Sequence, residues 1–334
     1  MADLTLPQDT FMGRAAAFLA QHGWAGATIA PLAGDASFRR YFRITDGDRR
    51  AVLMDAPPPQ EETAPFLAVA GWLAERGFAA PAIMAHEPAQ GLVLLEDFGD
   101  VRMRETVDAA APGDLSHYAA AIDLLVELHR HPAGPFRAYD RVELHREAAL
   151  LVDWYCPAVG LKVDAAGYAA AWDTVFGGAI AAAPVTVLRD YHAENLMLVG
   201  PKRRLGLLDF QDALAGHPAY DLVSLLQDAR RDVEPGVEAA MLARYMTATG
   251  QGDDFLAAYH VLGAQRNAKI IGIFTRLWQR DGKARYAGLC PRVWAYLERD
   301  LSEPVLEPVA AWFDEQVPPE LRGDPLILAP RGQE

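Results

Sequence analysis

The chain has 334 residues, of which 51% are hydrophobic and 23% are charged, as is usual for soluble globular proteins. Its 45 acidic residues outnumber its 31 lysines and arginines, and the net charge of −14 argues against a general binder of nucleic acid or anionic membranes. The two cysteines, Cys156 and Cys290, fit no metal-ligand spacing, and no uncharged apolar run is long enough to span a bilayer. We therefore expect a cytoplasmic protein with two buried thiols and with neither nucleic acid nor membrane as a partner.

The N-terminal part of the chain predicts a small antiparallel sheet accompanied by two helices. Apolar residues recur at helical spacing in Thr10–His22 and again in Thr63–Arg76, which follows the stiff connector Pro57–Pro59. Short apolar or alternating runs between turn residues indicate the strands Thr28–Leu32, Phe38–Ile44, Ala51–Met54, Ala82–His86 and Leu92–Leu95. Glu61 and Glu62 precede the second helix, and we interpret them as charges that suit its dipole because no lysine is present to pair with them.

From about residue 98 the pattern becomes almost entirely helical, so we expect two domains, residues 1–97 and residues 98–334. The expected helices of the second domain are Leu115–Arg130, Glu143–Tyr155, Ala165–Ala182, Ala219–Asp232, Val237–Thr249, Phe255–Gln279, Ala284–Leu301 and Pro308–Glu315. A sheet-rich first domain followed by a helical second domain predicts the α+β class.

One stretch, residues 185–212, interrupts the helices with short strands that end in polar residues. The expected strands are Val185–Leu188, Leu196–Val199 and Leu205–Leu208. Asp190 and Asn195 lie in the loop between the first two strands, and Asp209 follows the third. A carboxylate, a carboxamide and a second carboxylate can supply one base and two hard oxygen ligands, which phosphoryl transfer with magnesium requires. We therefore predict that Asp190 is a catalytic base and that Asn195 and Asp209 bind Mg²⁺.

The same residues carry a resemblance to a known family. Asp190-Tyr-His192-Ala-Glu-Asn195, followed by Leu208-Asp209-Phe210-Gln-Asp212, resembles the catalytic and metal motifs of the aminoglycoside phosphotransferase and choline kinase-like family, relatives of protein kinases. The resemblance implies a bilobal protein-kinase-like fold that uses ATP and Mg²⁺. Its small β-rich N-terminal lobe would bind the nucleotide, and its larger, mainly helical lobe would carry the catalytic loop and the substrate site. The resemblance also implies that His192 and Asp221 support the catalytic loop.

The chain departs from the family pattern in two places. The family usually has His-Gly before the catalytic aspartate, where this chain has Leu188-Arg189. Arg189 either pairs with a carboxylate and braces the loop or is simply solvated. The first lysine of the chain is Lys162, so the lysine of the kinase third strand is absent, and Met54 or Asp55 stands in its place.

A bound nucleotide would then need another source of positive charge. Arg39, Arg40 and Arg43 of the small lobe are the candidates. The loop with Gly34 and Ser37 lies where a kinase's glycine-rich loop covers the phosphates, and Glu96 lies where the hinge would meet the adenine. The residues that we predict to bind nucleotide are Gly34, Ser37, Arg39, Arg43 and Glu96.

Four segments sharpen the resemblance. They are MDAPP (Met54–Pro58), LLEDFGD (Leu94–Asp100), GHPAYDLVSLLQDARRDV (Gly216–Val233) and QRNAKIIGIFTRL (Gln265–Leu277). Together they are similar to segments of the bacterial anomeric N-acetylmuramate/N-acetylglucosamine kinases of peptidoglycan recycling. This resemblance implies transfer of the ATP γ-phosphoryl group to the C1 hydroxyl of an amino sugar.

The helical lobe offers basic residues for such a substrate. Arg266, Lys269 and Arg276 share one face of an expected helix beside apolar positions, which could bind a substrate carboxylate or phosphate. The alternative is a solvated face with helical ion pairs. For the lactyl carboxylate of N-acetylmuramate we predict Arg230, Arg231 and Arg266 as contacts.

Two other function classes remain open from the sequence. Another small-molecule kinase of the same fold could act on an aminoglycoside, choline or a homoserine-like hydroxyl, and the missing lysine would also suit a nucleotide-binding pseudokinase module. The basic stripe favours an anionic sugar over a cationic aminoglycoside. The presence of Asp190, Asn195 and Asp209 together favours an active enzyme.

Overall fold

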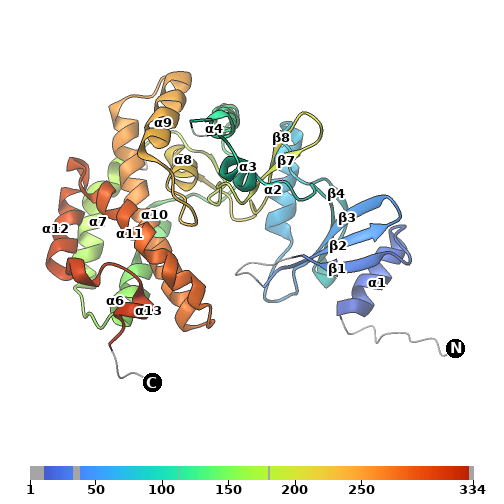
Figure 1. The fold of residues 1–334 in the computed structure, drawn as a ribbon, viewed down its shortest axis with the longest axis horizontal. Coiled ribbons are helices and arrows are strands. Elements are labelled where there is room, and N and C mark those ends of the chain that lie inside the picture. Colours follow the sequence, from blue (N-terminus) through green and yellow to red (C-terminus); the bar gives the residue numbers. More distant parts are fainter. Residues whose placement is uncertain (1–10, 33–37, 112, 180, 331–334) are drawn as a thin grey trace. The chain divides into compact units, whose positions relative to one another are not determined.

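The computed structural model describes residues 11–32, 38–111, 113–179 and 181–330. The chain forms two compact units (Figure 1). Unit 1 contains Met1–Ala109 together with Glu194–Asp212, and unit 2 contains Ala110–Ala193 together with Ala213–Glu334. These units differ from the continuous domains 1–97 and 98–334 expected from composition, because Glu194–Asp212 belongs with the N-terminal part of the chain.

Unit 1 is built on a five-stranded antiparallel sheet with the strand order β1-β2-β3-β5-β4. The strands are β1 (Thr28–Pro31), β2 (Arg40–Asp46), β3 (Arg49–Asp55), β4 (Ile83–Glu87) and β5 (Leu92–Glu96). Gly47, at φ 59°, permits the tight turn that joins β2 to β3. All five strands expected in this part of the chain are therefore confirmed.

Helix α1 (Phe11–Gln21) covers one face of this sheet, as Figure 1 shows. Phe18 of α1 belongs to a buried core that also contains Ile44, Leu53 and Leu94 from three neighbouring strands. Residues directly opposite each other in an antiparallel sheet share a face, so every second position of β2, β3 and β5 points to α1. The intervening positions point to the opposite face.

Helix α2 (Ala64–Glu75) follows β3 and is linked to the strand-end motif of residues 208–212. Its apolar stripe is buried, and Phe66 stacks on Phe210 with ring centroids 5.1 Å apart. Both rings are nearly inaccessible to solvent. This contact joins α2 to the residue that directly follows Asp209.

A β-hairpin returns to unit 1 from later in the sequence. Its strands are β7 (Leu196–Val199) and β8 (Arg204–Leu207). The N–H of Leu207 donates to the carbonyl of Ala79 at 2.7 Å, and helix α3 (Met103–Asp108) places Arg104 Nη1 2.8 Å from the Glu194 carboxylate. These bonds explain why the hairpin belongs to the same compact unit as the N-terminal part of the chain.

Unit 2 is mainly helical and contains one small antiparallel pair of strands, β6 (Val185–Val187) and β9 (Leu214–Gly216). Its helices are α4 (Ser116–Leu128), α5 (Arg141–Leu150), α6 (Cys156–Ala158), α7 (Ala165–Ala179), α8 (Ala219–Leu226), α9 (Pro235–Thr249), α10 (Asp253–Gln279), α11 (Cys290–Leu301), α12 (Glu307–Gln316) and α13 (Pro325–Leu328). The predicted α+β class is therefore confirmed.

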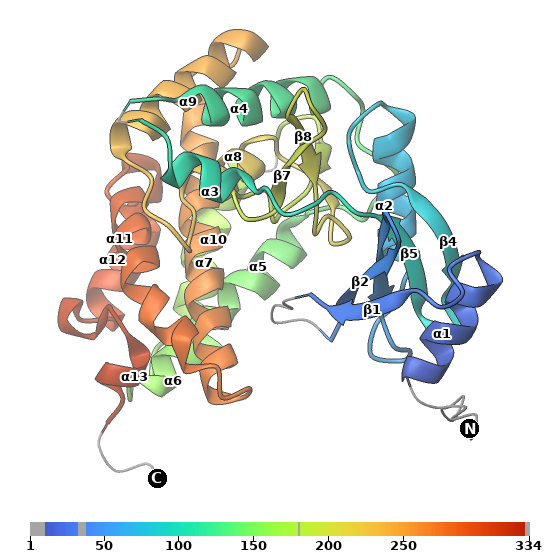
Figure 2. The same ribbon diagram turned by 45° about the vertical axis from the view of Figure 1, so that its right-hand side comes forward.

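Helix α10 is the centre of unit 2, and α5, α7, α8 and α11 pack around it (Figure 2). A Cβ atom on Gly272 of α10 would lie 2.3 Å from the carbonyl group of Leu150, so glycine permits the close approach to the end of α5. This packing matters for function because α5 and α10 both place polar side chains near the loop that follows β6.

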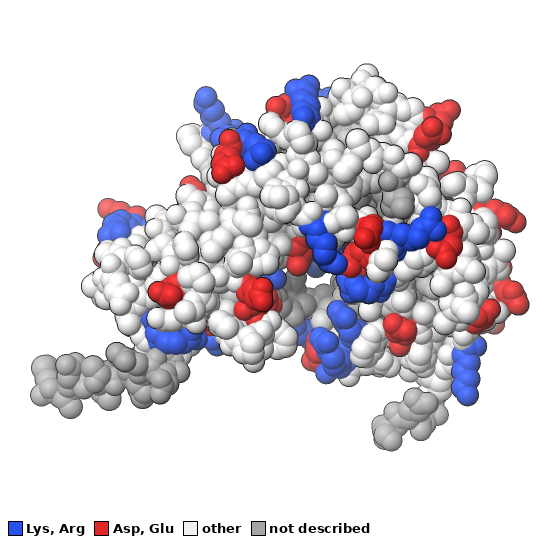
Figure 3. Space-filling view, turned by 180° about the vertical axis from the view of Figure 1, so that it is seen from behind, with Lys and Arg blue, Asp and Glu red and all other residues white. Residues whose placement is uncertain are grey.

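Two expectations from composition can be compared with the structure directly. Cys156 and Cys290 are free and buried, as predicted. Among the described residues, no helix combines the length and the apolar character needed to cross a membrane. On the face drawn in Figure 3, Lys and Arg side chains lie among Asp and Glu side chains and do not form one continuous basic surface.

Candidate active site

The loop that carries Asp190 is fixed through its backbone. Asp221, in the first turn of α8, accepts hydrogen bonds from the N–H groups of Leu188 at 2.7 Å and Arg189 at 2.8 Å. Arg189 has φ of 71°, a left-handed conformation that costs a non-glycine residue about 1–3 kcal/mol. Asp221 therefore holds a strained residue directly before the candidate base, which suits the supporting role predicted for it.

A second pair of side chains holds the carbonyl group of the same residue. Ser224 Oγ donates to the carbonyl oxygen of Arg189 at 2.9 Å and accepts a 2.8 Å hydrogen bond from Nη2 of Arg266 on α10. Ser224 is completely buried and Arg266 is only 3% exposed. Both backbone polar groups of Arg189 are thus bonded by side chains of α8, and α10 supports one of these side chains.

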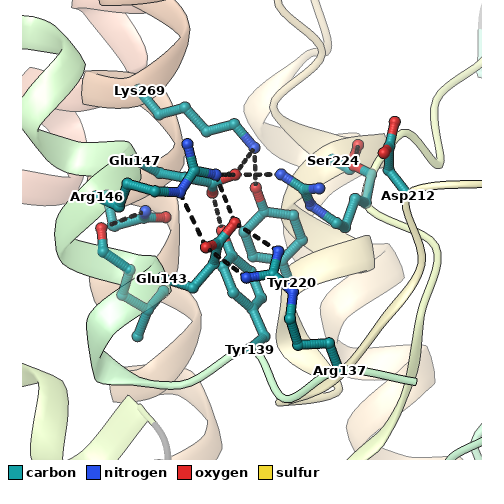
Figure 4. A network of polar contacts seen from close by, with 12 residues as sticks. Arg137, Tyr139, Glu143, Arg146, Glu147, Asp212, Tyr220, Ser224 and Lys269 are labelled. Atoms are coloured by element: carbon teal, nitrogen blue, oxygen red, sulfur yellow. Dashed lines mark hydrogen bonds and ion pairs between the residues drawn. The ribbon is translucent and has the colours of Figure 1, made fainter. Parts of the chain in front are cut away.

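The Arg189 side chain answers the question that the sequence left open. Its Nη2 donates to Glu147 of α5, so Arg189 pairs with a carboxylate rather than pointing into solvent. Figure 4 shows that Lys269 and Tyr139 also point toward Glu147; Lys269 Nζ lies 3.0 Å from Oε1, and the Tyr139 hydroxyl donates to Oε2. Lys269 additionally donates to the hydroxyl of Tyr220 at 3.2 Å.

Glu147 is charged despite its location. Its burial, at 2% exposure, acts to raise its pKa, but Lys269, Arg189 and the Tyr139 hydroxyl outweigh burial and lower the pKa overall. The carboxylate therefore holds two cations in fixed positions next to the Asp190 loop. No local pattern in the sequence predicts Glu147 as a functional residue, since it lies 42 residues before its partner Arg189.

Asp190 is ionised, as a catalytic base must be. Burial acts to raise its pKa, but His192, Lys269, Arg189 and Arg266 outweigh burial, so the pKa lies below the ordinary value. Because His192 is itself neutral at pH 7, the three permanent cations carry this effect. The loop residue is therefore a carboxylate at neutral pH.

His192 is a buried neutral histidine within the same loop. Burial lowers its pKa to about 3, and the adjacent Arg230 acts in the same direction. Arg230 Nη1 lies 3.1 Å from Nε2 of His192. Since an arginine can only donate, Nε2 is the acceptor and the ring proton is on Nδ1. These contacts suit the supporting role predicted for His192.

The two candidate metal ligands meet within unit 1 at the end of the β7–β8 hairpin. Leu196 pairs with Leu207 in the hairpin, and the carbonyl of Asn195 accepts a 3.0 Å hydrogen bond from the N–H of Leu208. The Asn195 Nδ2 atom then lies 3.5 Å from Oδ2 of Asp209. Asp209 also has a positive φ, 55°, and this conformation is a further sign of a functional position.

The donor atoms at this hairpin end fit magnesium. Oxygen atoms of one carboxylate and one carboxamide are hard ligands, and magnesium completes its octahedron with waters and substrate phosphates. A metal site built entirely from protein side chains would need a cluster of three or more His, Cys, Asp or Glu residues. The described residues contain no such cluster. Gln211 Nε2 donates to Asp209 Oδ1 at 2.9 Å and orients the carboxylate.

The three candidate arginines of the first strands differ in their partners. Arg40 pairs with the buried Asp55, and Arg43 places Nε 2.7 Å from the carboxylate of Asp97 and Nη2 2.9 Å from that of Asp100. Arg39 places Nε 3.1 Å from the carboxylate of Glu61. Two further residues predicted to bind nucleotide, Gly34 and Ser37, lie outside the described residues.

Glu61 lies before α2, as predicted, and is paired with Arg39. From the sequence we considered only a lysine as a partner and did not predict this arginine. The interpretation of Glu61 as a charge that suits the helix dipole stays a prediction. Glu96 ends β5, where its N–H and its carboxylate are both bonded to Ala82, and its nucleotide contact stays a prediction.

The three arginines predicted to contact a substrate carboxylate lie in unit 2 with distinct surroundings. Arg230 bonds His192, and Arg231 places its guanidinium 6.0 Å from the ring centroid of Tyr118. Arg266 is buried under Ser224, and its burial favours support of the loop over contact with a sugar. The predicted basic stripe is therefore not a uniformly solvated face, since Lys269 also belongs to the Glu147 cluster.

The fold and these two groups of residues define a phosphotransferase of the kinase-like class. A family model described as phosphotransferase enzyme family matches residues 28–260, and the chain belongs to this family. The crystal structure of a choline/ethanolamine kinase family protein from Mesorhizobium loti aligns with a TM-score of 0.62 at 17% identity, covering 91% of this chain and 99% of that one. This likeness shows the protein-kinase-like fold.

Sequence relatives narrow the class further. The chain is 40% identical to the N-acetylmuramate/N-acetylglucosamine kinase of Caulobacter vibrioides, in an alignment that covers 92% of this chain and 97% of the relative. It is 43% identical to the N-acetylmuramate/N-acetylglucosamine kinase of Pseudomonas aeruginosa, over 81% of this chain and 83% of the relative. The resemblance predicted from the motifs is therefore confirmed.

Proposed function

We propose that this protein is an ATP-dependent kinase that phosphorylates the anomeric C1 hydroxyl of N-acetylmuramate, N-acetylglucosamine or both, in the cytoplasmic recycling of cell-wall sugars. The observation that carries the proposal is its alignment, at 40% identity, with nearly the whole length of a relative named for these two substrates. The confirmed family supports phosphoryl transfer to an alcohol, and the ionised Asp190 supports the chemistry.

Asp190 would accept the proton of the sugar hydroxyl as the hydroxyl attacks the γ-phosphorus. An anomeric hydroxyl is more acidic than an ordinary alcohol, so a carboxylate of low pKa is a sufficient base. Asp221, Ser224 and Arg266 would keep the loop in position, because they hold the backbone of Arg189 directly before the base. Positioning of this kind accounts for much of the rate enhancement in phosphoryl transfer.

Asn195 and Asp209 would hold Mg²⁺, which neutralises charge on the phosphates when it is bound. The hairpin brings their side chains together, and Gln211 orients the Asp209 carboxylate. Arg230 and Arg231 remain our proposed contacts for the lactyl carboxylate of N-acetylmuramate. Arg43 and Glu96 remain proposed nucleotide contacts near the end of β5.

The test is an ATP-consumption assay over a panel of N-acetylmuramate, N-acetylglucosamine, kanamycin and choline. Phosphorylation at C1 removes the reducing end, so reducing-sugar content should fall in proportion to the ATP consumed. The corresponding sugar alcohol has no anomeric hydroxyl and should not be a substrate.

Each other outcome identifies a different function. Turnover of kanamycin or choline in place of the amino sugars would assign another acceptor to the same fold. ATP consumption without loss of reducing ends would mean that another hydroxyl accepts the phosphoryl group. No turnover with any member of the panel would favour a nucleotide-binding module.

A further inference from the structure

Unit 1 lacks the usual cation for the phosphates of a nucleotide. The only lysine in its sequence is Lys202, which lies in the exposed turn between β7 and β8. At the place expected for the kinase lysine, Met54 and Asp55 are both completely buried. If unit 1 binds the phosphates, as the proposed function requires, an arginine must provide the positive charge.

The register of the sheet excludes Arg40 from this role. Arg40 pairs with Asp55 across β2 and β3, and Asp55 pairs with Leu92, a residue of the core beneath α1. Arg40 therefore lies on the α1 face, where its guanidinium is 4.8 Å from the ring centroid of Phe11. The Arg40 guanidinium therefore contacts α1 and Asp55 on that face.

Tyr41 and Arg43 lie on the opposite face of β2, and Arg39 directly precedes this strand. Tyr41 pairs with Met54, so Met54, at the expected lysine position, is on this face as well. Arg43, further along the strand, is held by two acidic residues after β5, Asp97 and Asp100. Arg39 directly precedes the other end of the strand and is paired with Glu61.

The surroundings of Arg39 connect it to the candidate metal ligand. Burial acts to lower the pKa of Arg39, but Tyr41, Glu61, Asp209 and Asp212 outweigh burial and raise it. The field of Asp209 therefore acts on the Arg39 guanidinium within unit 1. Since a magnesium ion at Asp209 would be bound to phosphate oxygens, an arginine in the same electrostatic environment is placed for the same anion.

Glu61 orients this arginine through an ion pair. The pair is mostly shielded, with 12% of the Arg39 side chain and 16% of the Glu61 side chain exposed. Arg39 Nε donates to Glu61 Oε2 at 3.1 Å, and the guanidinium is a planar fork suited to phosphate oxygens. Glu61 lies just before α2, the helix that is tied to the Asp209 motif by the stack of Phe66 on Phe210.

We propose that Arg39, oriented by Glu61, binds the phosphates of the nucleotide in place of the lysine that related kinases carry on the third strand. The proposal rests on the proposed function for its ligand, a nucleoside di- or triphosphate with Mg²⁺. It moves the cation from β3 to the residue directly before β2 while keeping an acidic partner beside α2.

The test measures binding of Mg·ADP and of adenosine to the full-length protein by isothermal titration calorimetry at constant ionic strength. Arg39→Met should weaken Mg·ADP binding by roughly 10- to 100-fold, the scale of a charge-assisted hydrogen bond. It should leave adenosine binding within about twofold, because adenosine has no phosphate. Arg39→Lys, which keeps the charge but not the fork, should give an intermediate loss.

The matched control is Arg49→Met. Arg49 is also an arginine of this sheet, but its guanidinium lies 4.0 Å from the ring centroid of Trp24, a residue of the α1 core. The control should bind Mg·ADP like the parent protein. Glu61→Gln keeps the size of the side chain but not its charge, and should weaken Mg·ADP binding by a smaller factor than Arg39→Met.

Two results would overturn the proposal. One is unchanged Mg·ADP binding in Arg39→Met, and the other is an equal loss of adenosine and Mg·ADP, which would mark Arg39 as a structural ion pair. Failure of the proposed function gives a different result: the parent protein would bind Mg·ADP through Arg39 but would not turn over an amino sugar. If Arg39→Met does not fold, Arg39→Lys decides, since parent-like binding of Mg·ADP by a folded Lys variant contradicts a bidentate arginine contact.

Discussion

Asp190 owes its charge to permanent cations that other side chains hold in place. Lys269 and Arg189 are both bound to Glu147, and Arg266 is bound to Ser224. A carboxylate surrounded in this way remains ionised although much of its surface is shielded. At the residue scale, the charge of the candidate base therefore depends on side chains that need not touch a substrate.

Replacement of Asp190 by Asn tests the base directly. We expect kcat to fall by roughly 100-fold or more, because Asn cannot accept the proton of the sugar hydroxyl. Binding of Mg·ADP should change little. Steady-state kinetics and calorimetry provide the two measurements, and Asp173→Asn, at an exposed aspartate paired with Arg141, is the control. Near-normal turnover in Asp190→Asn would remove Asp190 from the role of base.

Replacement of Glu147 by Gln tests the buried cluster. Arg189 and Lys269 would lose their shared carboxylate while remaining buried, with 14% and 12% of their side chains exposed. Breaking such a buried pair costs about 3 kcal/mol, which urea unfolding followed by tryptophan fluorescence would measure. Glu127→Gln, at an exposed ion pair with Arg130, should cost no more than about 0.5 kcal/mol. Equal effects of the two substitutions would contradict a special role for Glu147.

At the scale of elements, short helix α8 contributes more than its length suggests. Its first turn provides Asp221 for the N–H groups before Asp190, and its next turn provides Ser224 for the carbonyl of Arg189. Both side chains project from the same buried helix. The helix therefore holds the backbone of the loop that carries Asp190.

Replacement of Ser224 by Ala separates positioning from folding. The change should cost about 1–2 kcal/mol of stability, because Arg266 and the carbonyl of Arg189 each lose a buried hydrogen-bond partner. We expect kcat to fall on the order of tenfold with little change in KM, since the base is misplaced while substrate contacts remain. Ser302→Ala removes an exposed hydroxyl at the end of α11 and should leave both constants unchanged. A change confined to KM would argue against a positioning role.

Most elements could be predicted from the sequence, and the exceptions have physical causes. Strand β7 has the predicted bounds, whereas α8 ends at Leu226 and does not continue to Asp232. The carboxylate of Asp228 bonds the N–H of Arg230, and such local bonds compete with helix formation. The expected helix Ala284–Leu301 begins its α-helical part only at Cys290, because Pro291 is favoured in a first turn and cannot donate within a helix.

The candidate site divides in a similar way. The proximity of Asn195 and Asp209 could be predicted because polar residues at the ends of paired strands lie close together, and the roles of Asp190, Asn195 and Asp209 stay predictions. Glu147 and Ser224 could not, since their partners are distant in sequence and each lies on a helix with an ordinary local pattern. The pairing of Arg40 with Asp55 also could not be predicted, because it depends on the register of β2 and β3.

At the scale of the whole molecule, the dependence of stability on pH is a balance between buried groups. His192 has a pKa of about 3 in the fold, below its ordinary value of 6.5, so its contribution is complete above pH 6.5 and declines as pH falls. Burial raises the pKa of Asp221 to about 7 and that of Asp300 to about 6, so these two groups act in the opposite sense. Acidification should therefore destabilise the protein less than its histidines alone would.

Replacement of His192 by Gln isolates one side of this balance. In the parent protein, His192 should lower the free energy of unfolding by about 2 kcal/mol between pH 7.5 and pH 5, because His192 takes up a proton in this range only in the unfolded chain. The variant should show a correspondingly smaller acid-induced loss of unfolding free energy. His22→Gln, at an exposed histidine, is the control. An identical pH dependence in the parent protein and His192→Gln would contradict the neutral buried histidine.

The discontinuity of unit 1 has a consequence for the order of synthesis on the ribosome. The sheet emerges first, but the hairpin whose N–H group bonds the carbonyl of Ala79 emerges only after Ala110–Ala193 of unit 2. Until then, Phe66 has no Phe210 to stack on. A nascent chain that ends at Ala109 should therefore be more sensitive to protease than one extended past Asp212. Completion of the first unit during translation must wait for part of the second, so the hairpin proposed to bind the metal is also the last piece of the sheet-containing unit to be synthesised.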